Sequence, residues 1–109
     1  MKDYLGELEH VVLLAVLRLG KDGYGVTIRE EIHGRTGRAI SPGTIYPTLD
    51  RLERKGFVRS VAGPPAAERG GRSRRLYRIA AGGLAALRAS EQALSALRSG
   101  FEDVLAEQE

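Results

Sequence analysis

The side chains of this sequence with the clearest chemical capacity are hydroxyls and cations gathered in residues 40–57. The segment reads I-S-P-G-T-I-Y-P-T-L-D-R-L-E-R-K-G-F. At helical spacing its apolar residues form one stripe, and the opposite face is predicted to carry Thr44, Tyr46, Thr48, Arg51, Arg54 and Lys55. Such side chains hydrogen-bond base edges and phosphates in a DNA major groove. A surface helix with a solvated charged face has the same pattern, so the segment alone leaves both interpretations open.

Basic residues are concentrated in the second half of this segment and beyond it. Between Arg51 and Arg78 there are nine basic and two acidic residues, a charge of +7. The whole chain has 17 basic and 14 acidic residues, so the remainder holds 8 and 12, a charge of −4. A clustered basic stripe is typical of phosphate binding. The residues predicted to contact DNA are Ser41, Thr44, Tyr46, Pro47, Thr48, Arg51, Arg54, Lys55, Arg69, Arg72, Arg74 and Arg75.

These residues are expected to divide into two roles. Base edges should be met by Thr44, Tyr46, Thr48 and Arg51. The remaining cations should hold phosphates or reach into the minor groove.

The sequence contains few of the residue patterns that are typical of catalytic or metal-binding sites. The chain has no cysteine and two histidines, His10 and His33, neither with a recognisable set of acidic and nucleophilic partners. The Gly70-Gly71 pair lacks the Lys-Ser/Thr of a phosphate-binding loop. No group of ligand residues has metal-binding spacing. We therefore predict no enzymatic activity, no metal site and no cofactor.

Local signals predict where the DNA-facing helix begins and ends. Ser41 is expected to be the N-cap, accepting a hydrogen bond from a backbone N–H of the first turn, and Pro42 to take the first helical position. Gly56 should end the helix in the left-handed conformation. Pro47 removes a backbone hydrogen bond, which predicts a bent or 3₁₀-like start. The buried stripe is predicted to be Ile45, Leu49 and Leu52.

Four further elements are expected to frame this helix. A first helix over residues 4–19 is apolar on nearly every side, which predicts burial on more than one side and hence a partner subunit. After a turn at 20–23, a second helix should run from residue 24 or 25 to 35. Two strands around a basic, Gly/Pro-rich loop describe a wing, and their predicted ranges are 57–61 and 73–79, with the loop at 63–72.

The last helix is predicted to run from residue 82 or 83 to 106. A near-heptad apolar stripe along it favours a dimerisation helix over a helix folded back on its own domain. The chain then divides into a DNA-binding domain, 1–80, and a dimerisation helix, 81–109. The residues predicted at the dimer interface are Leu5, Leu8, Val12, Val16, Leu87, Leu94, Leu97, Phe101 and Val104.

The seam between the first helix and the partner's last helix is the predicted position of a small-molecule effector. Apolar side chains such as Val12, Val16, Leu94 and Phe101 would line it, with Glu9 and His10 as polar anchors. A seam filled by side chains, with no ligand, is the open alternative.

Length and hydropathy bound the remaining classes. A chain of 109 residues fits one domain with an appended element. No apolar run approaches the roughly 20 residues needed to cross a bilayer, and the N-terminus M-K-D-Y-L-G-E lacks a signal-peptide pattern. We expect a cytoplasmic protein without a membrane partner.

Four segments together resemble the PadR family of bacterial transcriptional regulators. They are G-E-L-E-H-V-V-L-L-A-V-L at 6–17, Y-G-V-T-I-R-E-E-I at 24–32, S-P-G-T-I-Y-P-T-L-D-R-L-E-R-K-G at 41–56 and R-R-L-Y-R-I at 74–79. The resemblance covers roughly residues 5–83. The single C-terminal helix resembles that of the smaller subfamily. The resemblance implies a mainly α (α+β) fold, a winged helix-turn-helix domain with a C-terminal dimerisation helix. It also implies double-stranded DNA as partner, and repression by a homodimer at a palindromic promoter site.

Two departures from the family pattern are visible. Ala80 stands where the family usually has a Thr or Ser to cap the last helix, a change expected to cost about 1 kcal/mol. The chain has no tryptophan, so it lacks the stacking chemistry with which some relatives bind flat aromatic compounds.

The alternative function is a winged-helix protein-interaction module without specific DNA binding. Affinity for DNA that falls steeply with salt would favour the DNA-binding interpretation.

Overall fold

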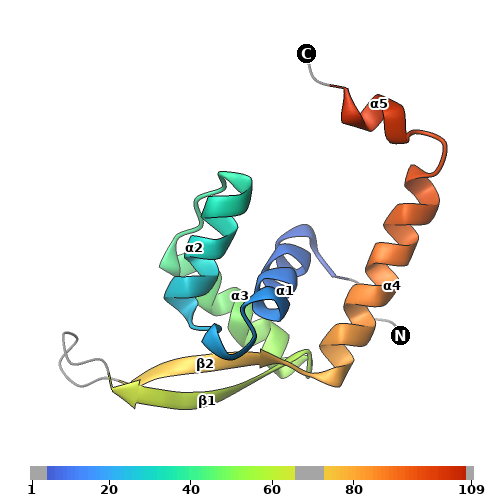
Figure 1. The fold of residues 1–109 in the computed structure, drawn as a ribbon. Coiled ribbons are helices and arrows are strands. Elements are labelled where there is room, and N and C mark those ends of the chain that lie inside the picture. The colour runs from blue at the N-terminus through green and yellow to red at the C-terminus, as the bar shows by residue number, and fades with distance from the viewer. Residues whose placement is uncertain (1–4, 66–72, 108–109) are drawn as a thin grey trace.

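The computed structural model describes residues 5–65 and 73–107 and has a helical body with a two-stranded hairpin. Its elements in order are α1 (Glu7–Leu19), the 3₁₀ turn η1 (Gly20–Asp22), α2 (Gly25–Thr36), α3 (Pro42–Arg54), β1 (Val58–Pro65), β2 (Ser73–Ile79), α4 (Ala81–Arg98) and α5 (Glu102–Ala106). Figure 1 shows α1, α2 and α3 packed over the β1–β2 hairpin, while α4 leaves this body and carries α5 away from it. The predicted mainly α, winged helix-turn-helix class is confirmed.

The core lies where the three N-terminal helices meet the hairpin. Its largest fully buried side chains are Leu13, Ile28, Ile45, Leu49, Leu52, Val12, Val16, Val58 and Thr48. The predicted stripe of α3 is therefore confirmed, because all three of its apolar members lie inside. Within the described residues, no helix is both long and apolar enough to span a bilayer.

Helix α1 is covered from several sides by its own subunit, which corrects part of the predicted dimer interface. It packs against α2, α3, β2 and α4. Val12 and Val16 are 0% and 1% exposed, and Leu87 of α4 is 3% exposed, so these three residues belong to the subunit's own core. Leu5 and Leu8 pack partly buried against the same core.

The ends of α3 follow the predicted signals with two differences. Ser41 is the N-cap residue, but its hydroxyl donates to Thr44 Oγ1 at 3.2 Å instead of accepting from a backbone N–H. The helix is α-helical through Pro47, and its 3₁₀ character is limited to one bond of the first turn, from Thr44 N–H to Ser41 O at 3.0 Å. Gly56 has φ 79°, as predicted. The N–H groups of Gly56 and Phe57 donate to the carbonyls of Glu53 and Leu52, both at 2.9 Å, which is the Schellman pattern of helix termination.

The hairpin is antiparallel, and its two faces differ. Ser60 pairs with Tyr77 and Arg59 with Arg78, and directly opposite residues share a face. Tyr77 is 2% exposed, so its face packs on the core, and both arginines lie on the outer face. The segment before α2 joins the edge of β2, because Tyr77 N–H donates to Gly23 O at 2.8 Å. A Cβ on Gly23 would lie 2.4 Å from Tyr77 O, so this approach requires glycine.

The C-terminal helix is interrupted, which corrects the prediction of one helix up to residue 106. Helix α4 ends at Arg98, and Gly100 follows with φ 91°, a conformation that favours glycine. Phe101 is then the N-cap residue of the short helix α5. The apolar residues before and after the break are therefore not on one continuous helical stripe. We call residues 88–107 the arm.

Candidate nucleic-acid interface

The outward face of α3 carries most of the polar residues predicted to contact DNA. Its exposed side chains are Ser41, Thr44, Tyr46, Pro47, Asp50, Arg51 and Arg54. Sequence reasoning omitted Asp50, although it lies three residues after Pro47 and four before Arg54 and so shares their face. A carboxylate on a DNA-facing helix can accept a hydrogen bond from the amino group of cytosine.

Thr48 does not lie on this face, which corrects its prediction as a base-contacting residue. Its side chain is 2% exposed, and its hydroxyl donates to the carbonyl of Thr44 at 2.8 Å. The spacing contained the signal, because Thr48 lies three residues after Ile45 and four before Leu52. Both neighbours are fully buried, so Thr48 extends their stripe.

Tyr46 is 40% exposed and is braced by the start of α2. Its ring lies so close to Gly25 that a Cβ there would be 2.4 Å from the phenolic oxygen. The glycine at the first position of α2 therefore makes room for the aromatic ring of α3. The two helices of the helix-turn-helix unit meet at this contact, and it limits the freedom of Tyr46.

Glu9 of α1 forms a buried ion-pair centre with two cations of α3. Its carboxylate accepts from Arg51 Nε at 3.3 Å, from Lys55 Nζ at 3.0 Å and from the backbone N–H of Gly6 at 3.0 Å. Burial raises the pKa of Glu9, but the Gly6 N–H and the two cations outweigh it and hold the pKa below its ordinary value. Glu9 is thus an ionised structural residue, and its predicted role as an anchor for an effector is wrong.

His10 is also occupied within the subunit, on the α4 side of α1. Its Nε2 lies 2.6 Å from Glu91 Oε2, and its Nδ1 lies 3.0 Å from Ser90 Oγ. The imidazole therefore fastens α1 to the middle of α4. Its expected role as a second anchor for an effector is corrected for the same reason.

The arginines of the hairpin fall into different environments. Arg74 stacks on the ring of Tyr24, with its guanidinium carbon 4.5 Å from the ring centroid. Arg75 Nε donates to Ser60 Oγ at 3.0 Å, and that hydroxyl donates to Glu53 Oε2 at 2.7 Å, which ties the hairpin to α3. The predicted contacts Arg69 and Arg72 lie outside the described residues.

Two arginines of the hairpin extend the positive surface from Arg54, the last residue of α3, onto the strands. Arg54, Arg59 and Arg78 are exposed. Within the described residues, none of them has a carboxylate at ion-pair distance. Sequence reasoning counted Arg59 and Arg78 in the basic segment but did not include them among the DNA contacts. An α-helix and an adjacent β-hairpin thus present cations on one connected part of the molecule.

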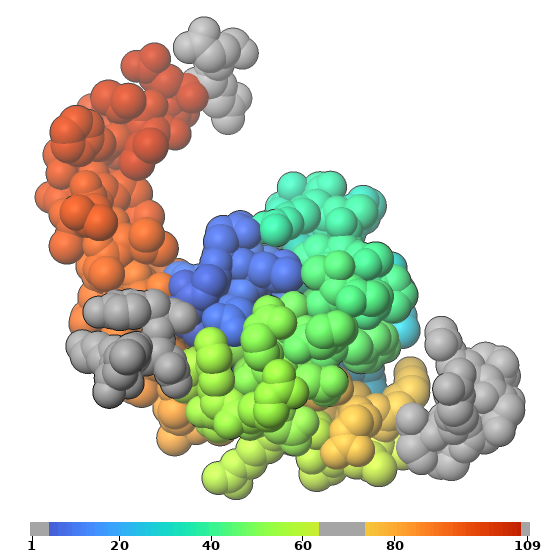
Figure 2. Space-filling view, turned by 180° about the vertical axis from the view of Figure 1, so that it is seen from behind, coloured from blue at the N-terminus to red at the C-terminus, as the bar shows by residue number. Residues whose placement is uncertain are grey.

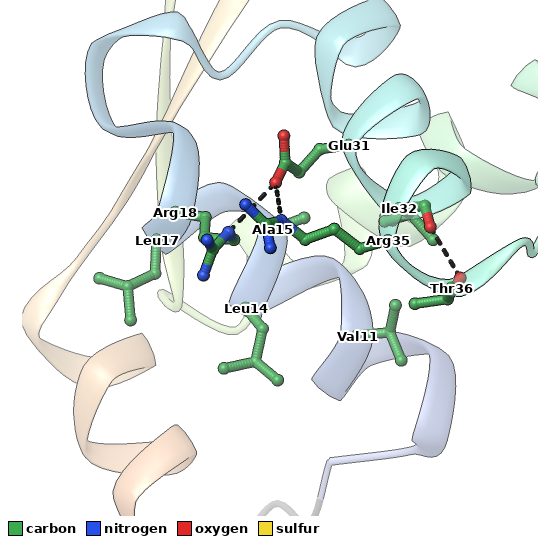
Figure 3. A pocket seen from close by; sticks show the side chains of 9 residues that line it. All are labelled: Val11, Leu14, Ala15, Leu17, Arg18, Glu31, Ile32, Arg35 and Thr36. Carbon is green, nitrogen blue, oxygen red and sulfur yellow. Dashed lines mark hydrogen bonds and ion pairs between the residues drawn. The ribbon is translucent and has the colours of Figure 1, made fainter.

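A separate apolar groove lies between α1 and α2, and we call it the α1 groove. It has a volume of about 340 Å³, and its lining residues are Val11, Leu14, Ala15, Leu17, Arg18, Glu31, Ile32, Arg35 and Thr36. Figure 3 shows Val11, Leu14 and Leu17 spaced along α1, with the ion-paired Arg18, Glu31 and Arg35 beside them. Leu14 and Leu17 are 39% and 44% exposed, so one subunit leaves this part of the apolar surface of α1 uncovered.

Comparisons with known proteins agree with this arrangement. The chain is 40% identical over 74 residues to Transcriptional regulator Rv3488 of Mycobacterium tuberculosis, a match that covers 68% of this chain and 64% of that relative. The chain therefore spans less than two thirds of the length of that relative.

Solved structures share the fold. A PadR family transcription regulator from Clostridium difficile has a TM-score of 0.72 at 22% identity, covering 93% of this chain and all of that one. A PadR-like transcriptional regulator from Bacillus cereus has a TM-score of 0.68 at 22% identity, covering 93% of both chains. The family model described as "Transcriptional regulator PadR-like family" matches residues 13–89. The exposed polar helix, the basic hairpin and this match over most of the chain lead to one conclusion: the protein belongs to the PadR-like family of transcriptional regulators.

Proposed function

We propose that this PadR-family regulator binds a specific double-stranded DNA site as a homodimer and represses the promoter that contains it. The observation that carries the proposal is the exposed polar face of α3 continued by the arginines of the hairpin. A short helix of this kind fits the major groove, and cations beside it suit the flanking phosphates. Repression follows where such a site overlaps the promoter.

The exposed residues of α3 suggest a division of labour on DNA. Arg51 and Asp50 are the leading candidates for base edges, because a guanidinium pairs with guanine and a carboxylate accepts from cytosine. Arg54, Arg59 and Arg78 suit phosphates, since they are exposed and unpaired with described carboxylates. Tyr46 and Thr44 supply hydroxyls at the start of the helix.

The homodimer is supported by two apolar surfaces on one chain. In the arm, Leu97 is 80% exposed, and Leu94, Phe101 and Val104 are between 46% and 62% exposed. The α1 groove is the complementary surface. In a two-fold dimer each arm can cover the partner's groove while its own groove is covered in return, so the same contact forms twice and each apolar patch is covered once. Such a dimer would present two copies of α3 to the two half-sites of a palindromic DNA site.

The decisive experiment selects binding sites from a random DNA pool and then measures affinity for the selected site and for random DNA over a range of salt. We expect strong preference for the selected site and an affinity that falls steeply with salt. Arg51→Ala should cost about 1–3 kcal/mol on the selected site and less on random DNA. Lys21→Ala is the control, because Lys21 is an exposed cation of the η1 turn, outside both α3 and the α1 groove.

Two results would contradict the proposal. Binding that selects no sequence would remove specific recognition. Binding to DNA that is independent of salt would favour the alternative, a module for protein interaction. Equal losses on selected and random DNA for Arg51→Ala would remove that residue from base readout.

We also expect an effector, if this regulator uses one, to bind at the seam formed by the α1 groove. Val12 and Val16 are buried, so the accessible lining is Val11, Leu14 and Leu17. A compound that releases DNA should lose its effect on Leu14→Trp, in which an indole fills part of the groove. A compound that acts equally on that variant binds elsewhere.

A further inference from the structure

We infer that Glu9 is a positioning residue for DNA recognition: from the first turn of α1 it fixes the orientation of Arg51 and Lys55 on α3. The inference rests on the proposed DNA-binding function. Glu9 itself does not lie on the exposed face of α3, and it would act through the cations that it holds.

The carboxylate of Glu9 is saturated by donors from two elements. Its residue is 6% exposed, and both oxygens are engaged, by Gly6 N–H, Arg51 Nε and Lys55 Nζ. A buried carboxylate without partners is strongly unfavourable, so moving the donors away from it costs free energy. Arg51 and Lys55 are therefore restrained by a partner more than 40 residues away, as the separations of 42 and 46 show.

The geometry decides which part of Arg51 remains available. Its Nε–H points to Glu9, and one N–H of Nη2 is directed to Thr48 Oγ1 at 3.4 Å. Both N–H groups of Nη1 and the second of Nη2 stay free of these partners. The outer edge formed by these groups can donate two parallel hydrogen bonds to guanine or phosphate. The Arg51 side chain is 46% exposed, so this edge reaches solvent.

The buried Thr48 takes part in the same arrangement. Its hydroxyl donates to Thr44 O and lies against Arg51, so it supports the guanidinium from the helix side. A guanidinium held on two sides loses less conformational entropy when it binds a base. Glu9 also offsets one positive charge of the pair, which should weaken binding to DNA of any sequence.

These two effects of Glu9 predict opposite changes when its charge is removed. In Glu9→Gln, Arg51 should lose its fixed orientation while a positive charge is unmasked. We expect the ratio of affinities for selected and random DNA to fall about 10-fold, the size of one good base contact. Affinity for random DNA should rise and its salt dependence should steepen, because one more cation is free for phosphate.

The matched control is Glu7→Gln, which removes the same charge from the same helical turn. Glu7 is exposed and accepts from Arg38 Nη1 at 2.8 and 2.6 Å, and among the described residues it pairs with no cation of α3. A second variant, Glu9→Asp, keeps the charge but shortens the side chain. It should lower the affinity ratio without strengthening binding to random DNA. Thermal melting of each variant confirms that binding is measured on folded protein.

A double-mutant cycle separates positioning from a general structural role. In the Arg51→Ala background, Glu9→Gln should leave the affinity ratio nearly unchanged, since there is no guanidinium left to orient. An unchanged ratio in both Glu9 variants, a fall of equal size in Glu7→Gln, or full additivity with Arg51→Ala would each overturn the inference. If the unmodified protein shows no preference among DNA sequences, the proposed function fails first, and the inference fails with it.

Discussion

The body of the molecule buries most of its apolar side chains within one chain, whereas the arm leaves its apolar side chains exposed. In the body, the aliphatic stripe of α3, which is Ile45, Leu49 and Leu52, is fully buried by α1, α2 and the hairpin. In the arm, Leu94, Leu97, Phe101, Val104 and Leu105 are between 46% and 80% exposed. Figure 2 shows the arm curving away from the body with open space between them. The core of the body is therefore complete within one chain, whereas the α1 groove and the arm keep exposed apolar side chains.

The junction between the two regions lies inside α4. Gly83 and Leu87 are its buried residues, and a Cβ on Gly83 would lie 2.1 Å from Phe57 O, so the first turn is closely docked on the residue that precedes β1. His10 holds the helix again at Ser90 and Glu91. Beyond Glu91 every described side chain is exposed. Such an exposed apolar surface on a single chain marks an interaction site.

The largest expected effect comes from opening the core of the body. Leu49→Ala should lower the free energy of unfolding by about 2–5 kcal/mol, because it leaves a cavity among fully buried side chains. Urea denaturation monitored by circular dichroism measures this loss. The control is Leu97→Ala in the arm, which should change the stability of dilute, monomeric protein by less than about 0.5 kcal/mol. Similar losses at both positions would show that the arm packs against its own body.

The second largest effect is expected in the arm, where a double substitution should abolish dimerisation and leave the body folded. Leu97→Asp combined with Phe101→Asp places two charges in the proposed interface, where burial without partners is strongly unfavourable. The double variant should weaken association at least about 100-fold, and sedimentation should then detect a folded monomer. Gln92→Asp with Ser95→Asp adds the same charges to polar positions of α4 and should remain dimeric. A stable dimer of the first variant would locate the interface elsewhere.

The smallest expected effect is the response of the body to acid. The pKa of Glu9 is lowered in the folded protein, so its ion pairs contribute stability above its ordinary pKa of 4.5, and that stability is lost as pH falls through the folded value. The melting temperature should therefore decrease as the pH is lowered below about 4.5, and this decrease should be smaller in Glu9→Gln. Identical pH profiles for the two proteins would mean that Glu9 contributes nothing to acid sensitivity.

The elements of the body could be predicted well because their signals are local. Ser41, Pro42 and Gly56 mark the ends of α3 within a few residues of chain, and the stripe from Ile45 to Leu52 follows helical periodicity. The hairpin was likewise indicated by two short strands around a Gly/Pro-rich loop. The break at Gly100 was missed, because the seven-residue spacing of apolar residues continued across it.

The sequence by itself determined the limits of α3, the two-stranded wing and the family, since each depends on neighbouring residues. Only the tertiary structure decided which polar residues are free. Glu9 is buried against Arg51 and Lys55, and His10 is joined to Glu91, because α1 lies between α3 and α4 in space. Partners 42 to 81 residues apart leave no periodic signal in the chain, and they meet only when the helices pack.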